Sequence, residues 1–314
     1  MNDFTPSEFW KNFRLGTELT VSGNFIYNGL HCFDLMPHFY YEDESFEFLY
    51  NIAVGIERLQ KITLILVEHN ENVNQEEFEK SLITHNHSEL HKRINKIQPI
   101  NLGKVHSKFL TLLSTFYKSV RYERYNLQSV FSTEKGRSEL INFIQENLKT
   151  PISIDFFGCT TNDVKIKKFI GRVIGKICTE YYEQIINECK RLNIYTHEIS
   201  IESKAFKIFI SKKFDFTEEK LIQKEIIKYL IQGNLPKGFN EYIKHKAPLD
   251  LEFYNPNLYI NYLMSYHKNT GIKGEIEELY SEINNLSERI NHLEPIGNND
   301  VDFDFEIDNY DEPR

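Results

Sequence analysis

Apolar residues that recur at spacings of three and four dominate this 314-residue chain and favour a helical fold. The clearest case is residues 44–68, where one face carries Phe48, Ile52, Ile56, Leu59, Thr63 and Leu66. The same pattern predicts helices over residues 75–97, 104–126, 134–148, about 162–192 and 217–232. We therefore expect a mainly α protein with a helical bundle over residues 44–232.

Three segments depart from this pattern. Residues 1–43 are expected to be mixed and extended around Gly23 and Gly29, with Pro37 breaking any helix. Residues 194–212 alternate apolar and polar side chains, for example at Phe206 and Ile208, which predicts a small β-hairpin. Residues 233–274 are rich in Pro, Gly, Asn and Tyr and are expected to wrap the surface.

Residues 275–294 carry a heptad seam that is typical of a two-stranded parallel coiled coil. Its apolar positions are Ile276, Leu279, Ile283, Leu286, Ile290 and Leu293. The seam covers fewer than three heptads, so docking on the protein's own core is an equally open alternative. The acidic tail, residues 295–314, is expected either to be a solubilising terminus or to cover a basic site in cis. A homodimer is predicted, and a partner protein can be expected to bind through residues 275–314.

Composition narrows the class of protein. Four Cys occur without a CxxC pair, which argues against a disulfide framework or a Cys-based zinc site and favours a reducing cytosol. The longest apolar run, residues 62–67, is too short to span a bilayer, and no signal peptide is visible, so we expect a cytoplasmic protein without a membrane segment. The formal net charge is −9, so a nucleic-acid site would have to be a local patch. No cofactor and no metal are expected.

The run THNHSELH, residues 84–91, contains the letters H-N-H but is not an HNH nuclease motif, because that label describes residues dispersed through a different fold. His87 and His91 lie four residues apart, a spacing that can hold zinc on one helix face. A third ligand is missing nearby, since Glu89 points to another face. Exposed polar helix residues are the favoured interpretation.

The run STFYKSVRYERYNL, residues 114–127, is the strongest candidate site. Arg121 and Arg124 lie three apart and can converge on one helix face, which Tyr117 and Tyr125 border. Guanidinium groups suit bidentate contacts to phosphate, and tyrosine can stack on a base. The alternative is structural, with each arginine paired inside the bundle to an acid such as Glu57, Glu123 or Glu180.

Three stretches, FEFLYNIAVGIERLQKI, EKSLITHNHSELHKRI and FYKSVRYERYNL, resemble the helical core of the HEPN superfamily. The later run YYEQIINECKRLNIYTHEISIESKAFKIF resembles the second half of an uncharacterised HEPN sub-family, and the whole resemblance spans roughly residues 20–212. The resemblance implies a helical bundle that usually dimerises, and in many members a metal-independent endoribonuclease of toxin–antitoxin and phage-defence systems. It also implies a catalytic arginine followed four to six positions later by a histidine, near the dimer interface. Arg121 matches the arginine, whereas Asn126, Leu127 and Gln128 stand where the histidine is expected, and Tyr125 precedes them.

The missing histidine leaves three outcomes open. RNA cleavage without metal needs a group that takes the proton of the attacking 2′-OH, and histidine is best matched to that task near pH 7. A distant histidine (His85, His91 or His106) completes the site, or Tyr125 and Asn126 position a slow reaction, or the site binds RNA without cutting it. The expected function is therefore RNA binding or endoribonuclease activity in bacterial phage defence or stress. A non-catalytic dimeric scaffold or regulator is the alternative.

Overall fold

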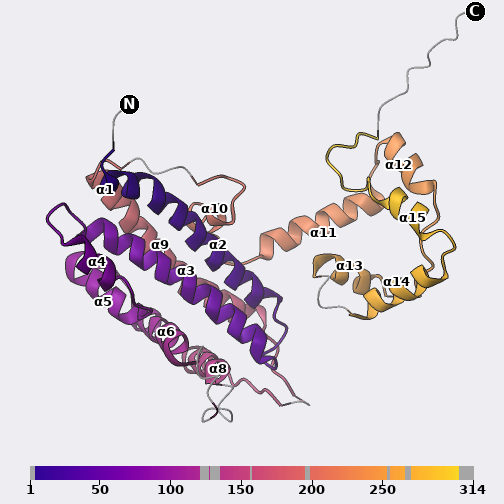
Figure 1. Cartoon of the computed structure of the whole chain (residues 1–314). Coiled ribbons are helices and arrows are strands. Elements are labelled where there is room, and N and C mark those ends of the chain that lie inside the picture. The colour runs from indigo at the N-terminus through magenta and orange to yellow at the C-terminus, as the bar shows by residue number, and fades with distance from the viewer. Residues whose placement is uncertain are drawn as a thin grey trace, which may run out of the picture. The chain divides into compact units, whose positions relative to one another are not determined.

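The computed structural model is mainly helical and consists of two compact units, Met1–Phe216 and Thr217–Arg314 (Figure 1). Within the described residues there is no β-strand, only an isolated bridge between His38 and Thr161, so the predicted mainly α class is confirmed. The structure describes residues 4–120, 127, 135–155, 158–194, 199–252, 255–265 and 270–303.

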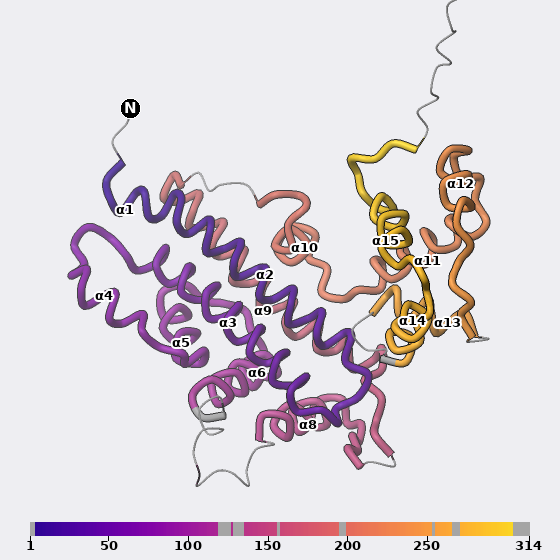
Figure 2. Tube along the Cα trace, turned by 45° about the vertical axis from the view of Figure 1, so that its right-hand side comes forward, coloured from indigo at the N-terminus to yellow at the C-terminus, as the bar shows by residue number. Residues whose placement is uncertain are grey.

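Two long helices, α2 (Leu15–Leu35) and α3 (Glu42–Glu68), form the spine of the first unit (Figure 2). The prediction of a mixed and extended segment over residues 1–43 was wrong for residues 6–35, which are helical, whereas residues 36–41 are not. Its glycines are places where helices touch: a Cβ on Gly29 would lie 2.7 Å from Ile52, and one on Gly55 would lie 2.6 Å from Ile26. The Ser22 hydroxyl adds a buried 2.7 Å hydrogen bond to the Gly55 carbonyl. Glycine here allows close helix packing, and the resulting burial outweighs its low helix propensity.

The N-terminal segment reaches α2 through α1 (Pro6–Phe9) and a π-helical stretch, Trp10–Arg14. Thr5 caps α1, because its hydroxyl accepts a hydrogen bond from the Glu8 amide while the Glu8 carboxylate accepts one from Thr5. The expectation for Pro37 holds, since α2 ends at Leu35 with Met36 as its C-cap.

The remaining helices of the first unit bury the apolar face of α3 predicted from periodicity. Phe48, Ile52, Ile56 and Leu59 are all fully buried. The helices that follow α3 are α4 (Gln75–Ser81), α5 (His87–Ile97), α6 (Lys104–Thr115), α8 (Lys135–Leu148) and α9 (Val164–Arg191).

Residues 75–97 form two helices and not the single helix predicted. The chain leaves α4 at Leu82, and Asn86 starts α5 as an N-cap whose side chain accepts a hydrogen bond from the Glu89 amide at 3.3 Å. Residues 82–86 between them therefore form a short connection, and this connection carries His85.

The β-hairpin predicted over residues 194–212 is also wrong for the part that the structure describes. Residues Lys204–Phe209 form the helix α10, which Ser203 caps by accepting a 3.1 Å hydrogen bond from the Phe206 amide. Ala205, Ile208 and Phe209 are buried, at a helical spacing. Over so short a run, the alternation at Phe206, Ile208 and Ile210 that suggested a strand cannot be distinguished from a helical spacing. The packing of Ala205 on Gly23 favours the helix.

The second unit contains α11 (Thr217–Gln232), α12 (Lys237–Lys244), α13 (Pro256–Met264), α14 (Thr270–Glu282) and α15 (Leu286–Leu293). Helix α11 falls within this unit and not within the bundle predicted over residues 44–232. Residues 233–274 contain two helices of this unit and not only the irregular chain expected.

The heptad seam of residues 275–294 is interrupted. Helix α14 ends at Glu282, and α15 begins anew at Leu286. Asn285 is the N-cap of α15, because its side chain accepts a 3.2 Å hydrogen bond from the Glu288 amide. A single coiled-coil helix over 275–294 is therefore wrong. Most of the acidic tail, residues 304–314, lies outside the described residues. Across the parts of the chain that are described, no helix combines the length and apolar character needed to cross a membrane.

Candidate functional site

Four of the five predicted site residues, Arg121, Arg124, Tyr125 and Asn126, lie outside the described residues. The fifth, Tyr117, lies in a π-helical stretch, Phe116–Val120, that continues α6, and it is 7% exposed. Such stretches are rare and often mark functional sites. The Tyr117 ring packs on His85, with ring centroids 4.3 Å apart, and stacks on Tyr50 at 6.4 Å.

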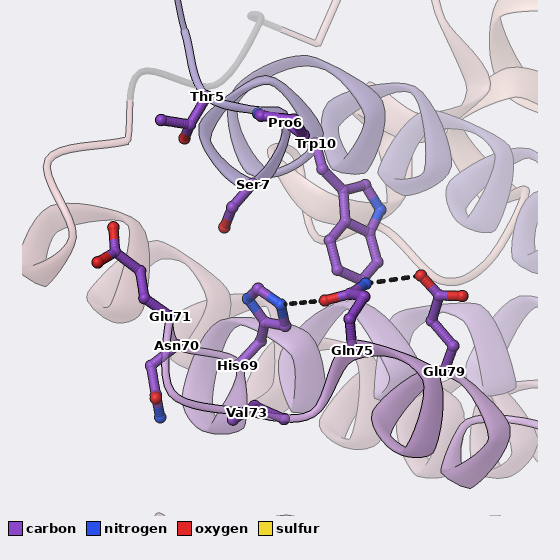
Figure 3. A pocket seen from close by; sticks show the side chains of 10 residues that line it. All are labelled: Thr5, Pro6, Ser7, Trp10, His69, Asn70, Glu71, Val73, Gln75 and Glu79. Carbon is purple, nitrogen blue, oxygen red and sulfur yellow. Dashed lines mark hydrogen bonds between the residues drawn. The ribbon is translucent and has the colours of Figure 1, made fainter.

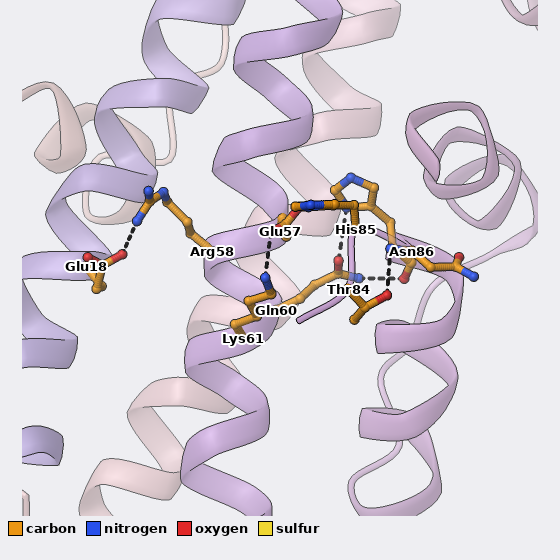
Figure 4. Close-up of polar contacts among 9 residues, drawn as sticks. Glu18, Glu57, Arg58, Gln60, Lys61, Thr84, His85 and Asn86 are labelled. Atoms are coloured by element: carbon orange, nitrogen blue, oxygen red, sulfur yellow. Dashed lines mark hydrogen bonds and ion pairs between the residues drawn. The ribbon is translucent and has the colours of Figure 1, made fainter. Parts of the chain in front are cut away.

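His85 and Glu57 form the polar centre of this region (Figure 4). The His85 Nδ1 lies 2.8 Å from Glu57 Oε2, and the other carboxylate oxygen accepts a 2.6 Å hydrogen bond from Lys61 Nζ. Glu57 is buried, with 10% of its side chain exposed, whereas 43% of the His85 side chain is exposed. Lys61 therefore fixes the Glu57 carboxylate, and this carboxylate orients His85, which remains accessible to solvent.

The connection between α4 and α5 is held in place by further polar contacts. The Thr84 hydroxyl accepts a 3.2 Å hydrogen bond from the Asn86 amide, and Gln60 on α3 donates at 3.0 Å to the His87 carbonyl (Figure 4). Because Gln60 and Glu57 lie one turn apart on α3, the helix that anchors the connection also presents the carboxylate to His85.

A cavity of about 370 Å³ lies beside these residues. We call it the His85 cavity; its polar lining is Glu18, Glu57, Arg58, Lys61, His85 and Tyr117, and its apolar lining includes Trp10, Leu15 and Ile62. Arg58 forms an ion pair with Glu18 on α2, and 38% of the Arg58 side chain is exposed. The cavity thus combines two cations, each paired with a carboxylate, two aromatic rings and a histidine, and its volume falls at the lower end of the range for small-molecule sites.

The chemistry available here is proton transfer. A histidine whose Nδ1 is bonded to a carboxylate is fixed in orientation, and the carboxylate stabilises the protonated ring. The hydrogen bonds of the described residues involve only Nδ1 of His85, and none reaches its other nitrogen, Nε2. His85 can therefore give or take a proton at Nε2 without losing its contact with Glu57.

The other histidines considered for this role have structural partners. His91 Nδ1 lies 2.9 Å from the Tyr181 hydroxyl, and burial lowers the His91 pKa. His106 Nδ1 accepts a 3.1 Å hydrogen bond from the Gly103 amide at the start of α6, and burial lowers the His106 pKa. His87 is fully buried, Nδ1 lies 3.1 Å from Gln60 Oε1, and burial lowers the His87 pKa to about 3.

These positions also bear on the zinc spacing of His87 and His91. Both rings contact core residues, and His87 is not the exposed helix residue that the sequence favoured. No group of three or more potential metal ligands occurs among the residues that the structure describes.

Two of the three acids considered as structural partners of the arginines, Glu57 and Glu180, are each paired with a lysine, and the third, Glu123, lies outside the described residues. Glu57 binds Lys61 and His85, and Glu180 lies 2.5 Å from Lys176 while accepting a hydrogen bond from the Asn101 amide. Sequence reasoning named His85 only as one of three distant histidines. The signal that singles it out is Glu57, 28 residues earlier, and only the fold brings the two together.

Comparison with models of protein families, with curated proteins and with solved structures finds no match to this chain.

Proposed function

We propose that this chain is a HEPN-type RNA-binding protein or metal-independent endoribonuclease of bacterial phage defence or stress, in which His85 takes the role of the missing signature histidine. The observation that carries the proposal is the 2.8 Å contact between His85 and Glu57 beside Tyr117. Arg121 follows Tyr117 by four residues in the sequence, so the tyrosine that contacts His85 belongs to the same run as the arginine motif.

The proposed step uses the RNA itself as nucleophile. His85 Nε2 takes the proton of a 2′-OH while that oxygen forms a bond to the adjacent phosphorus. The bond from phosphorus to the 5′-oxygen then breaks, the leaving oxygen takes a proton from water, and the His85 imidazolium returns its proton to the solvent, which leaves a 2′,3′-cyclic phosphate and a 5′-OH. In this scheme Arg121 contacts the phosphate, Arg124 assists, and Glu57 stabilises the imidazolium.

The direct test is cleavage of a labelled single-stranded RNA by the purified chain in the presence of EDTA. We expect products ending in a cyclic phosphate, and we expect His85→Ala to lower the rate by about 10²- to 10⁴-fold, the usual contribution of a general base. RNA affinity should change by less than about threefold, because His85 acts on the proton and not on the phosphate charge. Arg121→Ala should weaken both cleavage and binding.

His106→Gln serves as the matched control, because His106 is also a histidine of the first unit but does not line the His85 cavity. It should retain wild-type cleavage. Equal losses in His85→Ala and His106→Gln would contradict the assignment of His85. Binding without cleavage in the wild type would leave the RNA-binding function, and absence of both would overturn the proposal.

A second candidate is a scaffold that binds a partner protein or a second copy through the second unit. Helix α11 leaves large apolar side chains exposed in this unit, including Ile222, Ile226, Tyr229 and Leu230 at about half exposure. Light scattering of the wild type and of Ile226→Asp tests self-association: a dimer that becomes a monomer in the variant would support this candidate.

A further inference from the structure

A second, larger pocket lies at the N-terminal end of the first unit (Figure 3). It has a volume of about 680 Å³, and we call it the N-terminal pocket. The residues that matter here are Ser7 and Trp10 from the start of the chain, His69 and Glu71 after α3, and Gln75 and Glu79 on α4. In Figure 3, Ser7 and Trp10 extend from the α1 side toward His69 and Gln75.

A chain of hydrogen bonds determines which nitrogen of His69 carries a proton. The Glu79 carboxylate can only accept, so Gln75 Nε2 donates to Glu79 Oε1 at 2.6 Å. Gln75 Oε1 therefore points to His69 Nε2, 2.8 Å away, and accepts a hydrogen bond from its N–H (Figure 3). The neutral ring is thus protonated on Nε2, and Nδ1 presents a lone pair.

This lone pair has no partner. His69 is 8% exposed, and its Nδ1 is a buried atom without a hydrogen bond. The nitrogen lies on the ring edge that faces away from Gln75, toward the side of the pocket that carries Glu71 (Figure 3). A buried acceptor left unpaired is unfavourable, and an N–H donor that enters the pocket would satisfy it.

The charge of the pocket favours a cation. Glu71 and Glu79 line it, and no Lys or Arg does. Helix α3 ends beside it at Glu68, with His69 as C-cap, so the negative end of a 27-residue helix dipole faces this region. Lys11 does not line the pocket, but its ammonium donates at 2.8 Å to the His69 carbonyl at the end of α3 and interacts with the charge of Glu71, so it offsets part of the negative charge there. The indole of Trp10, with its centroid 5.3 Å from the His69 ring, offers an aromatic wall.

We propose that the N-terminal pocket binds an organic ammonium or guanidinium group, whose N–H donates to His69 Nδ1 and whose charge lies against Glu71. The ligand is either a free amine or the side chain of a lysine or arginine of a partner protein. This site is independent of the RNA function proposed above, since its residues other than Trp10 do not line the His85 cavity.

Trp10 makes the proposal testable, because it is the single tryptophan of the chain. The full-length protein is titrated with phenethylammonium chloride, and with 2-phenylethanol as the uncharged analogue, while tryptophan emission is followed. We expect a saturating change with the amine and at least tenfold weaker binding of the alcohol. Glu71→Gln should weaken amine binding at least fivefold and leave alcohol binding unchanged.

Two controls separate this site from other effects. Glu76→Gln removes the same charge from α4 outside the pocket and should leave amine affinity unchanged. His85→Ala is titrated as well, because Trp10 also lines the His85 cavity. A response kept in His85→Ala and lost in Glu71→Gln assigns the amine to the N-terminal pocket. His69→Phe, checked for helical content by circular dichroism, should also lose the preference for the amine.

Equal affinities for amine and alcohol, or an unchanged affinity in Glu71→Gln, would overturn the proposal whether or not the protein cleaves RNA. Comparison of spermidine with Nα-acetyl-lysinamide then distinguishes the sources. Tighter binding of spermidine indicates a free polyamine, and tighter binding of the lysine derivative indicates a protein side chain.

Discussion

The imidazole of His85 lies on the ring of Tyr117, with centroids 4.3 Å apart, although His85 belongs to the connection between α4 and α5 and Tyr117 to the π-helical stretch after α6, more than thirty positions later. This contact joins the two parts of the candidate site. Tyr117 belongs to the arginine- and tyrosine-rich run that the sequence singled out, and His85 contributes the acid–base group that this run lacks.

Glu57→Gln should reduce RNA cleavage by about 10- to 10³-fold, because the amide can hold the His85 ring but cannot stabilise its positive charge. The loss is expected in kcat, with little change in KM, and is read from single-turnover and steady-state rates. Glu146→Gln, a change at a surface pair with Lys108, is the matched control. A loss confined to KM would show that Glu57 acts in binding.

Stability should fall as the pH drops below about 6.5, because the folded protein holds His87 neutral. Burial lowers the His87 pKa to about 3, so between pH 6.5 and 3 the unfolded chain binds a proton that the folded one does not. One such group contributes a slope of about 1.4 kcal/mol per pH unit to the free energy of unfolding. The lowered pKa values of His91 and His106 act in the same direction.

Urea unfolding at pH 7, 6, 5 and 4 measures this slope, and His87→Asn isolates the contribution of one residue. The difference in free energy between wild type and variant should narrow steadily as the pH falls, since the variant lacks the titrating group. A difference that stays constant from pH 7 to 4 would refute the burial of a neutral His87.

Gly55→Ala should destabilise the first unit by about 1–3 kcal/mol, because the new methyl group would lie 2.6 Å from Ile26 at the contact of α2 and α3. Gly274→Ala is the control: nothing lies within 4 Å of that position in α14, and alanine is the better helix former. Thermal unfolding should show a lower Tm for Gly55→Ala and no decrease for Gly274→Ala. Equal behaviour of the two variants would contradict the close packing.

Residues 1–216 should fold without the second unit, because the polar network and the apolar core around α3 are complete within them. Expressed alone, this segment should unfold cooperatively on heating and retain the helical content expected from its helices. Loss of cooperative unfolding in the shorter chain would mean that the second unit stabilises the first.

The sequence alone determined the helices whose apolar faces repeat over many turns. Helices α3, α8 and α9 begin and end close to their predicted limits, because a long 3.6-residue period is a local property of the chain. The sequence did not predict the helices over residues 6–35 and 204–209, where helix formation depends on what the segment packs against. Gly23 and Gly29 resemble turn residues in isolation and become close contacts only when Ala205 and Ile52 lie opposite them.

The candidate site, too, could be predicted only in part from the sequence. Periodicity and residue type identified Tyr117 as a candidate, but the partnership of His85 with Glu57 joins positions 28 residues apart. It exists because Leu82 and Asn86 interrupt the helix predicted over 75–97, and because Gln60 holds the resulting connection against α3. Only tertiary structure decides such a contact, since it depends on the path of the chain between helices and not on the preferences of either residue.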